Sequence, residues 1–283
     1  MNDSKTAIMV DSGCDIPKEL LQKYDIKVLH LKVIYGNDIY SDGLDIDPMT
    51  VYERFSEIIP KTSTPNMQEV IDVVEDIKAC GYENVIAITI SSGLSGTFNT
   101  VSTTFDEIED VNTYAFDSRN ISIGAGLLAL WAAEKLAAGA SFGDVVAGLE
   151  KKRYDSKVFF YMDTLDYLRK GGRINPAVAI VGKALNLKPI ISCNEKGMYY
   201  TVAKIRGSVK GMSKLMDAVS EFAKDDVVDM ALMNGDAAGT ADQMRPILTG
   251  ALPNGKIVVD KQITASLAIH TGPGLIGIGI LRK

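Results

Sequence analysis

The sequence is poor in the residues that build disulfide frameworks and metal centres. Its three cysteines, Cys14, Cys80 and Cys193, are widely separated and form no Cys-x-x-Cys pair. This spacing argues against a disulfide scaffold or a zinc motif, and we interpret all three as small core residues. The two histidines, His30 and His270, are too few for a histidine-rich metal site. We therefore expect no metal and no cofactor.

Basic runs and long apolar stretches are also missing. The formal net charge is -6, from 36 acidic and 30 basic residues, which gives no electrostatic footprint for nucleic acid. No segment has the apolar length of a membrane span, and the apolar run at 7–10 is too short for a signal peptide. We expect a cytoplasmic protein that binds no nucleic acid and does not insert stably into membranes.

The apolar pattern of the first half predicts an α/β domain. Short runs rich in β-branched residues alternate with segments of helical period, which is typical of parallel strands joined by crossover helices. We predict strands at 7–10, 26–34, 85–90 and 113–116. They indicate a largely parallel sheet with flanking helices, in an N-terminal domain of residues 1–156.

Capping residues mark the helices between these strands. Asp15 precedes the first predicted helix, Pro48 begins one that runs to Ile59, and Asn66 caps a third. Residues 60–65 are predicted as a loop. After residue 156 the order of elements changes, which predicts a C-terminal α/β domain with a mixed sheet and helices. Its strands are predicted at 158–162, 199–205, 229–233 and 257–259 and in a glycine-interrupted segment at the C-terminus.

Hydroxyl side chains stand where a parallel sheet binds ligands. Thr62 precedes the helix capped by Asn66, and Ser95 follows the strand at 85–90. Hydroxyl groups and free helix N–H groups at such positions favour an anion, so a carboxylate fits between Thr62 and Ser95. Helix capping alone is the alternative interpretation. Gly93-Leu94-Ser95 also begins like the nucleophile elbow G-x-S-x-G, but Thr97 replaces its last glycine.

Several separated segments together resemble the DegV family of bacterial lipid-binding proteins over nearly the whole chain. The segments are Val10-Asp11-Ser12, Thr62-Ser63-Thr64-Pro65, Ser91-Ser92-Gly93-Leu94-Ser95-Gly96-Thr97-Phe98, Asp117-Ser118, Leu168-Arg169-Lys170-Gly171-Gly172-Arg173-Ile174, Lys188-Pro189-Ile190 and Ile269-His270-Thr271-Gly272-Pro273-Gly274. The resemblance implies a long-chain fatty acid, such as hexadecanoate, between the two domains. It implies that Thr62 and Ser95 hold the carboxylate and that His270 lies near it.

The same resemblance implies a partner protein. Some members of the family are binding subunits of a fatty-acid kinase and present the carboxylate to a separate ATP-using protein, which makes an acyl-phosphate for phospholipid metabolism. Arg173, after two glycines, and Arg206, at a strand-to-helix junction, match residues of the family associated with the phosphate or the kinase. From its position alone, Arg173 is also explained as a surface cation at a helix end.

Other patterns are weaker or misleading. Residues 272–277 satisfy G-x-G-x-x-G, but the motif lies at the C-terminus and opens no βαβ unit, so we reject a dinucleotide site. Without a phosphate-binding motif, the chain is predicted to be a carrier and not an enzyme. The alternatives are a serine hydrolase or acyltransferase using Ser95 and His270, and a lipid-responsive sensor. His270 alone is also explained as a core histidine, and His30 is interpreted as a structural strand residue.

Overall fold

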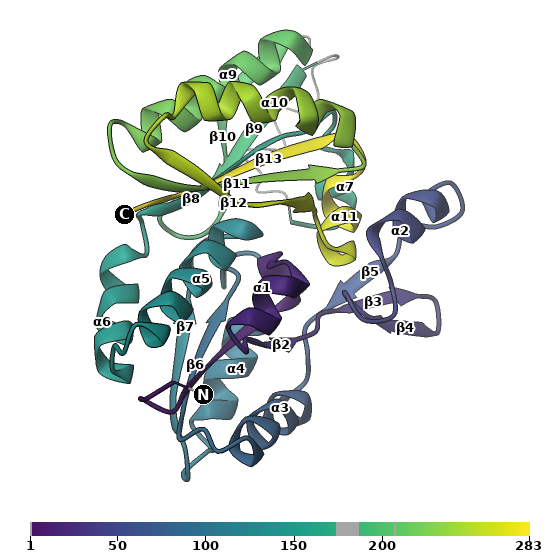
Figure 1. Ribbon diagram of the computed structural model, residues 1–283. Helices are drawn as coiled ribbons and strands as arrows, with labels where there is room; N and C mark the ends of the chain where they lie inside the picture. Colours follow the sequence, from purple (N-terminus) through teal and green to yellow (C-terminus); the bar gives the residue numbers. More distant parts are fainter. Residues whose placement is uncertain (1, 174–186, 207) are drawn as a thin grey trace.

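The computed structural model describes residues 2–173, 187–206 and 208–283. Within these residues the strands form a four-stranded, a six-stranded and a three-stranded sheet. Figure 1 shows the two larger sheets one above the other, with helix α5 (Ile123–Ala137) between them. The small sheet belongs to an arm that projects at the right of this view.

The four-stranded sheet is parallel throughout, in the order β2-β1-β6-β7, as the apolar runs predict. Its strands are β1 (Thr6–Asp11), β2 (Lys27–Leu29), β6 (Asn84–Thr89) and β7 (Asn112–Asp117). Strands β1 and β6 are almost entirely buried because helices cover both faces of the sheet. Helices α3 (Met67–Ala79) and α4 (Thr97–Phe105) pack on one face, and α5 packs on the other.

The six-stranded sheet is mixed, which confirms the architecture predicted for the second half. Its order is β10-β9-β8-β13-β11-β12, and only β11 and β12 pair in parallel. The strands are β8 (Ser156–Tyr161), β9 (Leu187–Cys193), β10 (Tyr199–Arg206), β11 (Val228–Gly235), β12 (Gly255–Gln262) and β13 (Leu275–Arg282). Helices α9 (Ser208–Ala223) and α10 (Ala238–Ala251) cover its outer face. The domain boundary at residue 156 stays a prediction.

Helix α5 joins the two large sheets into one core. It is apolar on almost all sides, which is typical of a helix enclosed by protein. Small residues let neighbouring backbones approach: a Cβ at Gly126 would lie 2.3 Å from the Cys14 carbonyl oxygen. On the side facing the six-stranded sheet, a Cβ at Gly279 of β13 would lie 2.7 Å from the Ile123 side chain. The two halves therefore share a continuous apolar core.

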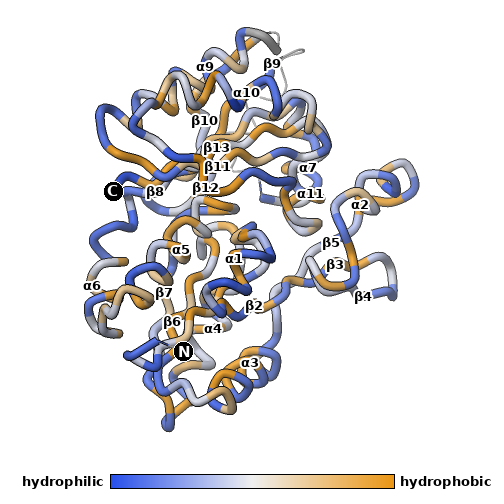
Figure 2. Tube along the Cα trace, in the orientation of Figure 1, coloured by the Kyte–Doolittle hydropathy of each residue, from blue (hydrophilic) through white to orange (hydrophobic). Residues whose placement is uncertain are grey.

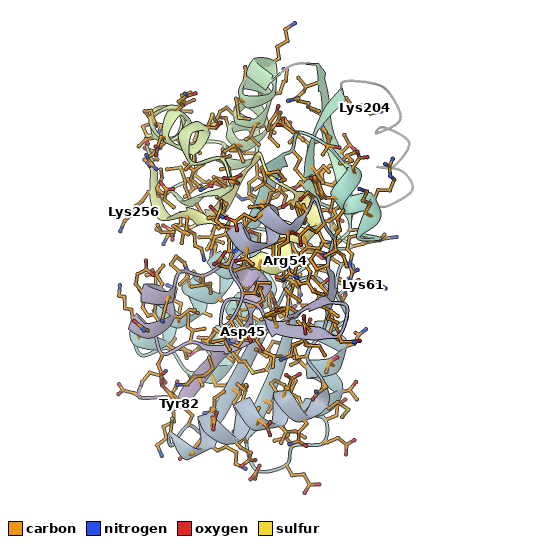
Figure 3. All side chains as sticks on the ribbon, turned by 90° about the vertical axis from the view of Figure 1, so that its right-hand side faces the viewer. Asp45, Arg54, Lys61, Tyr82, Lys204 and Lys256 are labelled. Atoms are coloured by element: carbon orange, nitrogen blue, oxygen red, sulfur yellow. The ribbon has the colours of Figure 1, made fainter. Side chains whose placement is uncertain are left out.

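The arm is the main feature that differs from the sequence prediction. It contains β3 (Lys32–Tyr35), β4 (Asp38–Ser41), helix α2 (Pro48–Arg54) and β5 (Lys61–Ser63), with the antiparallel strand order β4-β3-β5. The single strand predicted at 26–34 is wrong, because the chain leaves the parallel sheet after Leu29 and enters the arm at Lys32. Residues 61–63, predicted as loop, form β5. Figure 3 faces the arm and labels Asp45, Arg54 and Lys61 on it.

Several local predictions can be compared with the structure. Asn66 caps α3 as predicted, in a capping box with Glu69. Asp15 does not cap α1 (Lys18–Lys23): it is buried, and its carboxylate accepts hydrogen bonds from Ser122 and from the Thr264 backbone N–H instead. The remaining short helices are η1 (Ser12–Cys14), α6 (Phe142–Lys152), α7 (Asp166–Lys170) and α11 (Ala265–Thr271).

The cysteines and His30 also differ in part from expectation. Cys14 and Cys193 are buried, but Cys80 is exposed and is not a core residue. His30 lies between β2 and β3 and not within a strand, and its Nδ1 atom is 2.7 Å from the carbonyl oxygen of Asp42. In the described part of the chain, no helix has both the length and the apolar character needed to cross a bilayer.

Candidate functional site

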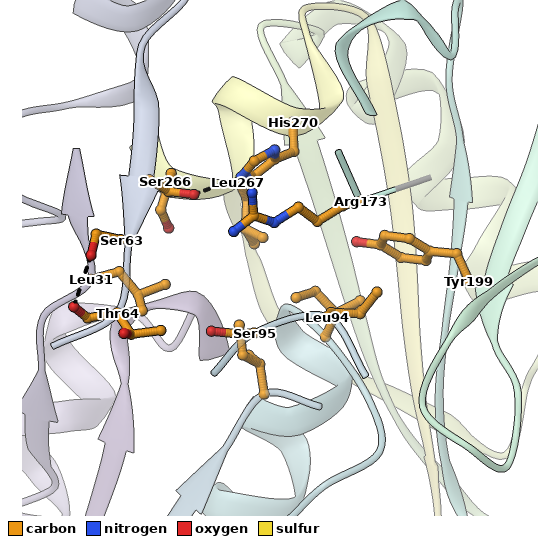
Figure 4. A pocket seen from close by; sticks show the side chains of 13 residues that line it. Leu31, Ser63, Thr64, Leu94, Ser95, Arg173, Tyr199, Ser266, Leu267 and His270 are labelled. Atoms are coloured by element: carbon orange, nitrogen blue, oxygen red, sulfur yellow. Dashed lines mark hydrogen bonds between the residues drawn. The ribbon is translucent and has the colours of Figure 1, made fainter. Parts of the chain in front are cut away.

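A small cavity lies where the arm, helix α11 and the loop at 90–96, between β6 and α4, meet (Figure 4). Its volume is about 40 Å³. A water needs roughly 10–15 Å³ of such space, so the cavity has room for about three waters, the size of a carboxylate group. Its lining comes from both halves of the chain: Leu31, Thr62, Ser63, Thr64, Ile90, Leu94, Ser95, Ile121, Arg173, Tyr199, Ser266, Leu267 and His270.

Thr62 reaches this cavity because it lies in a strand. In β5 it pairs with Val33 of β3, and its neighbours Lys61 and Ser63 are exposed while Thr62 is half-buried. This alternation is the two-residue period of a strand, which turns Thr62 inward. Its Oγ1 lies 2.9 Å from Nε2 of His270. The capping interpretation is wrong for Thr62, since Asn66 caps the following helix.

Ser95 reaches the cavity from the turn between β6 and α4. Its Oγ accepts a hydrogen bond from the Thr97 backbone N–H at 3.3 Å, and it lies 2.8 Å from the Thr97 hydroxyl. Ser95 thus accepts the first N–H of α4, but the N-cap residue of this helix is Gly96 and not Ser95. A serine hydroxyl has two acceptor lone pairs and one donor. When both contacts with Thr97 use the lone pairs, the Ser95 hydrogen is free to donate to a ligand.

His270 stands in the last turn of α11 as a neutral imidazole. Burial, reinforced by the positive charge of Arg173, lowers the pKa of His270 to about 4. Its buried Nδ1 atom has no hydrogen-bond partner among the described residues, and a Cβ at Gly171 would lie 2.1 Å from it. His270 is thus not a fully satisfied core histidine: one nitrogen faces Thr62, and the other is enclosed by the Gly171 backbone.

This arrangement does not build a hydrolytic serine. The ring nitrogen of His270 that has a partner contacts Thr62, whereas the Ser95 hydroxyl contacts Thr97. A nucleophile–base pair requires a hydrogen bond between the two, with the base oriented by a third group. A histidine whose pKa is about 4 is also a weak base at neutral pH.

Arg173 supplies positive charge to the cavity. Its Nη1 donates a hydrogen bond to the Gly171 carbonyl oxygen at 2.7 Å, and the half-buried side chain lies between His270 and Tyr199 in Figure 4. Burial raises the pKa of Tyr199, against the opposing effect of Arg173, so its hydroxyl stays protonated. The side chain of Arg206, the other predicted arginine, lies outside the described residues.

Among the polar residues of the cavity lining, sequence reasoning missed two. Tyr199 begins β10, and Ser266 lies one helical turn before His270 in α11. The spacing of four residues places Ser266 and His270 on the same helix face. A prediction of helix α11 would have shown that these two residues share a face. The helix has only seven residues, which is too short for its period to be recognised in the sequence.

The sequence matches one protein family along almost its whole length. The family model described as "Uncharacterised protein, DegV family" matches residues 5–283. The chain belongs to the DegV family. It is 37% identical over 279 residues to a DegV domain-containing protein of Clostridium acetobutylicum, covering 99% of each chain. It is 29% identical over 276 residues to Protein DegV of Bacillus subtilis, covering 96% of this chain and 97% of the other.

Solved structures of DegV proteins share the complete fold. The crystal structure of DegV, described as a fatty acid binding protein from Bacillus subtilis, superimposes with a TM-score of 0.89 at 28% identity and covers 100% of both chains. A stearic acid-binding protein from Eubacterium ventriosum superimposes with a TM-score of 0.89 at 27% identity, covering 98% of each chain. The fold and the family implied by the sequence resemblance are therefore confirmed.

Proposed function

We propose that this DegV-family protein binds a long-chain fatty acid and that Thr62 and Ser95 hold its carboxylate. The observation that carries the proposal is the convergence of two hydroxyls and one guanidinium group, from both halves of the chain, on a cavity of carboxylate size. Fatty acid binding by solved relatives at TM-scores of 0.89 supports the same ligand class.

The hydrogen-bonding capacity of the site matches a carboxylate. An ionised carboxylate only accepts hydrogen bonds, so each protein group around it has to donate. If His270 carries its proton on Nε2, it donates to the Thr62 oxygen, and the Thr62 hydrogen is free to donate to the ligand. Ser95 donates as described above, while Arg173 compensates the negative charge. Carboxylate binding therefore selects the Nε2–H tautomer of His270.

The acyl chain is proposed to supply most of the affinity. Leu94, Ile121 and Tyr199 line the carboxylate-sized cavity and provide its first apolar contacts. Burial of about 14 methylenes at about 0.8 kcal/mol each contributes on the order of 11 kcal/mol before the cost of ordering the chain. Apolar contacts thus supply affinity, and the polar groups select an acid over an alcohol or ester.

We further propose that the protein is a carrier that presents the carboxylate to a separate ATP-dependent fatty-acid kinase. Phosphoryl transfer requires a cradle for the nucleotide phosphates, and the sequence has no Walker-type motif. Residues 272–277 run into β13, which begins at Leu275, and open no helix, so they do not match a dinucleotide site. Arg173, together with Arg206, is the proposed contact for the phosphoryl group or the kinase.

Two measurements test this function. Native mass spectrometry of the purified protein should detect a bound fatty acid, and titration of delipidated protein should show binding of hexadecanoate. Replacing both Thr62 and Ser95 by alanine should weaken that binding. The affinity for hexadecanol, which has no carboxylate, should differ far less between wild type and this double variant. Purified protein without lipid, together with no binding on titration, would refute the proposal.

A further inference from the structure

Asp42 is a fully buried carboxylate that joins three separate parts of the chain. It directly follows β4 of the arm and has 0% exposure. Its Oδ2 accepts hydrogen bonds from the hydroxyls of Ser12, at 2.8 Å, and Ser266, at 2.5 Å. Its Oδ1 accepts the Ser266 backbone N–H at 3.0 Å. Its own backbone N–H donates to the Leu31 carbonyl oxygen at 2.9 Å.

These bonds determine where helix α11 lies. The first N–H groups of a helix have no partner within it, and the N-cap residue Thr264 contributes no side-chain cap. Asp42 accepts one of these groups and holds the Ser266 hydroxyl as well. Asp42 therefore fixes both the position of the helix start and its rotation about the helix axis.

The rotation matters because His270 is one turn further along the same face. A side chain roughly 5–6 Å from the helix axis moves by about 1 Å for each rotation of about 10°. The Thr62–His270 contact is 2.9 Å long, so a shift of that size would break it. Thr62 is tied to the same residue from the other side, because β5 pairs with β3 and β3 pairs with β4, which ends next to Asp42.

We propose that Asp42 is a positioning residue for the carboxylate site. It sets the location of α11 relative to the arm and keeps Nε2 of His270 within hydrogen-bonding distance of Thr62, while its own carboxylate lies outside the cavity lining. The ligand part of this inference rests on the proposed function, whereas the positioning of His270 is independent of any ligand.

The test compares Asp42→Asn with Asp38→Asn as a matched control. Asp38 is the first residue of β4, the strand that Asp42 follows, but it is exposed. The first readout is the ¹⁵N NMR spectrum of the His270 ring in delipidated protein, and the second is the dissociation constant for hexadecanoate. Asp42→Asn should shift both His270 ring signals and weaken binding about tenfold or more, and Asp38→Asn should change neither.

A double-mutant cycle separates positioning from a general loss of structure. In a Thr62→Val background the contact that Asp42 supports is already absent, so Asp42→Asn should weaken hexadecanoate binding much less than in wild type. Equal losses in both backgrounds would overturn the inference. If Asp42→Asn does not fold, Ser266→Ala removes one donor to Asp42, and unchanged His270 signals in that variant would overturn it equally.

The outcomes also distinguish this inference from the proposed function. If wild-type protein binds no fatty acid but Asp42→Asn still shifts the His270 signals, the proposed function fails and the positioning role of Asp42 stands. If wild-type protein binds hexadecanoate and Asp42→Asn alters neither the signals nor the affinity, the positioning role fails alone.

Discussion

Replacement of Thr62 by valine isolates the contribution of one hydroxyl group to carboxylate binding. Valine has nearly the same shape as threonine, so the loss is the hydrogen bond and not packing. A hydrogen bond to a charged group contributes about 1.5–3 kcal/mol, which corresponds to an increase of about 10- to 150-fold in the dissociation constant. Thr62→Ser keeps the hydroxyl and is the matched control.

Isothermal titration of delipidated protein measures this difference directly. Hexadecanoate should bind Thr62→Val about 10- to 150-fold more weakly than wild type, while Thr62→Ser should stay within a few-fold of wild type. Hexadecanol, which has no carboxylate, should bind all three proteins similarly. The reasoning is refuted if serine and valine cause equal losses, or if the alcohol loses as much affinity as the acid.

Three further predictions concern titrating groups and thiols. Burial raises the pKa of Asp11 from 3.8 to about 7, so the folded protein binds this proton more tightly and the contribution of Asp11 to the free energy of unfolding increases as the pH falls from 8 to 5. Asp15 and His270 titrate in the same range with opposite effects, so the test is a difference: in urea unfolding, the free energy of Asp11→Asn should gain less, or lose more, than that of wild type between pH 8 and pH 5. Arg173→Gln should raise the pKa of His270 from about 4, but the pKa should stay below 6.5 because burial is the larger cause. NMR titration measures this pKa, and an unchanged value would contradict the effect assigned to the Arg173 charge. A thiol reagent should modify Cys80 in the folded protein and the two buried cysteines only after unfolding.

Local signals predicted the regular part of the fold. The strands of the parallel sheet are short apolar runs flanked by turn residues, and the capping box at Asn66 is visible in four consecutive letters of sequence. The arm was not predictable in this way. The run at 26–34 reads as one strand, but it is divided because the Leu31 backbone bonds to Ser12 and Asp42, which lie far from it in the sequence.

The candidate site shows the same limit. Thr62, Ser95, Arg173 and His270 were all singled out from the sequence, and the structure brings them to one cavity. Their roles in binding stay a prediction. Asp42 was not singled out, because its importance depends on contact with Ser266, which is 224 residues away. Hydrogen bonds of that kind leave no periodic pattern in a sequence.

The enclosure of α5 constrains how a lipid can reach the cavity. Opening the molecule like a hinge would separate α5 from β13 and expose Ile123 and Leu127, which pack against Gly279. Exposure of these two side chains alone would cost about 3–6 kcal/mol, against a typical total stability of about 5–15 kcal/mol. If the protein binds a fatty acid as proposed, we therefore expect lipid exchange to proceed by local displacement of the arm or of α11, and not by hinge opening. A cross-link that fixes the arm should slow the exchange, whereas a cross-link between α5 and β13 should leave its rate unchanged.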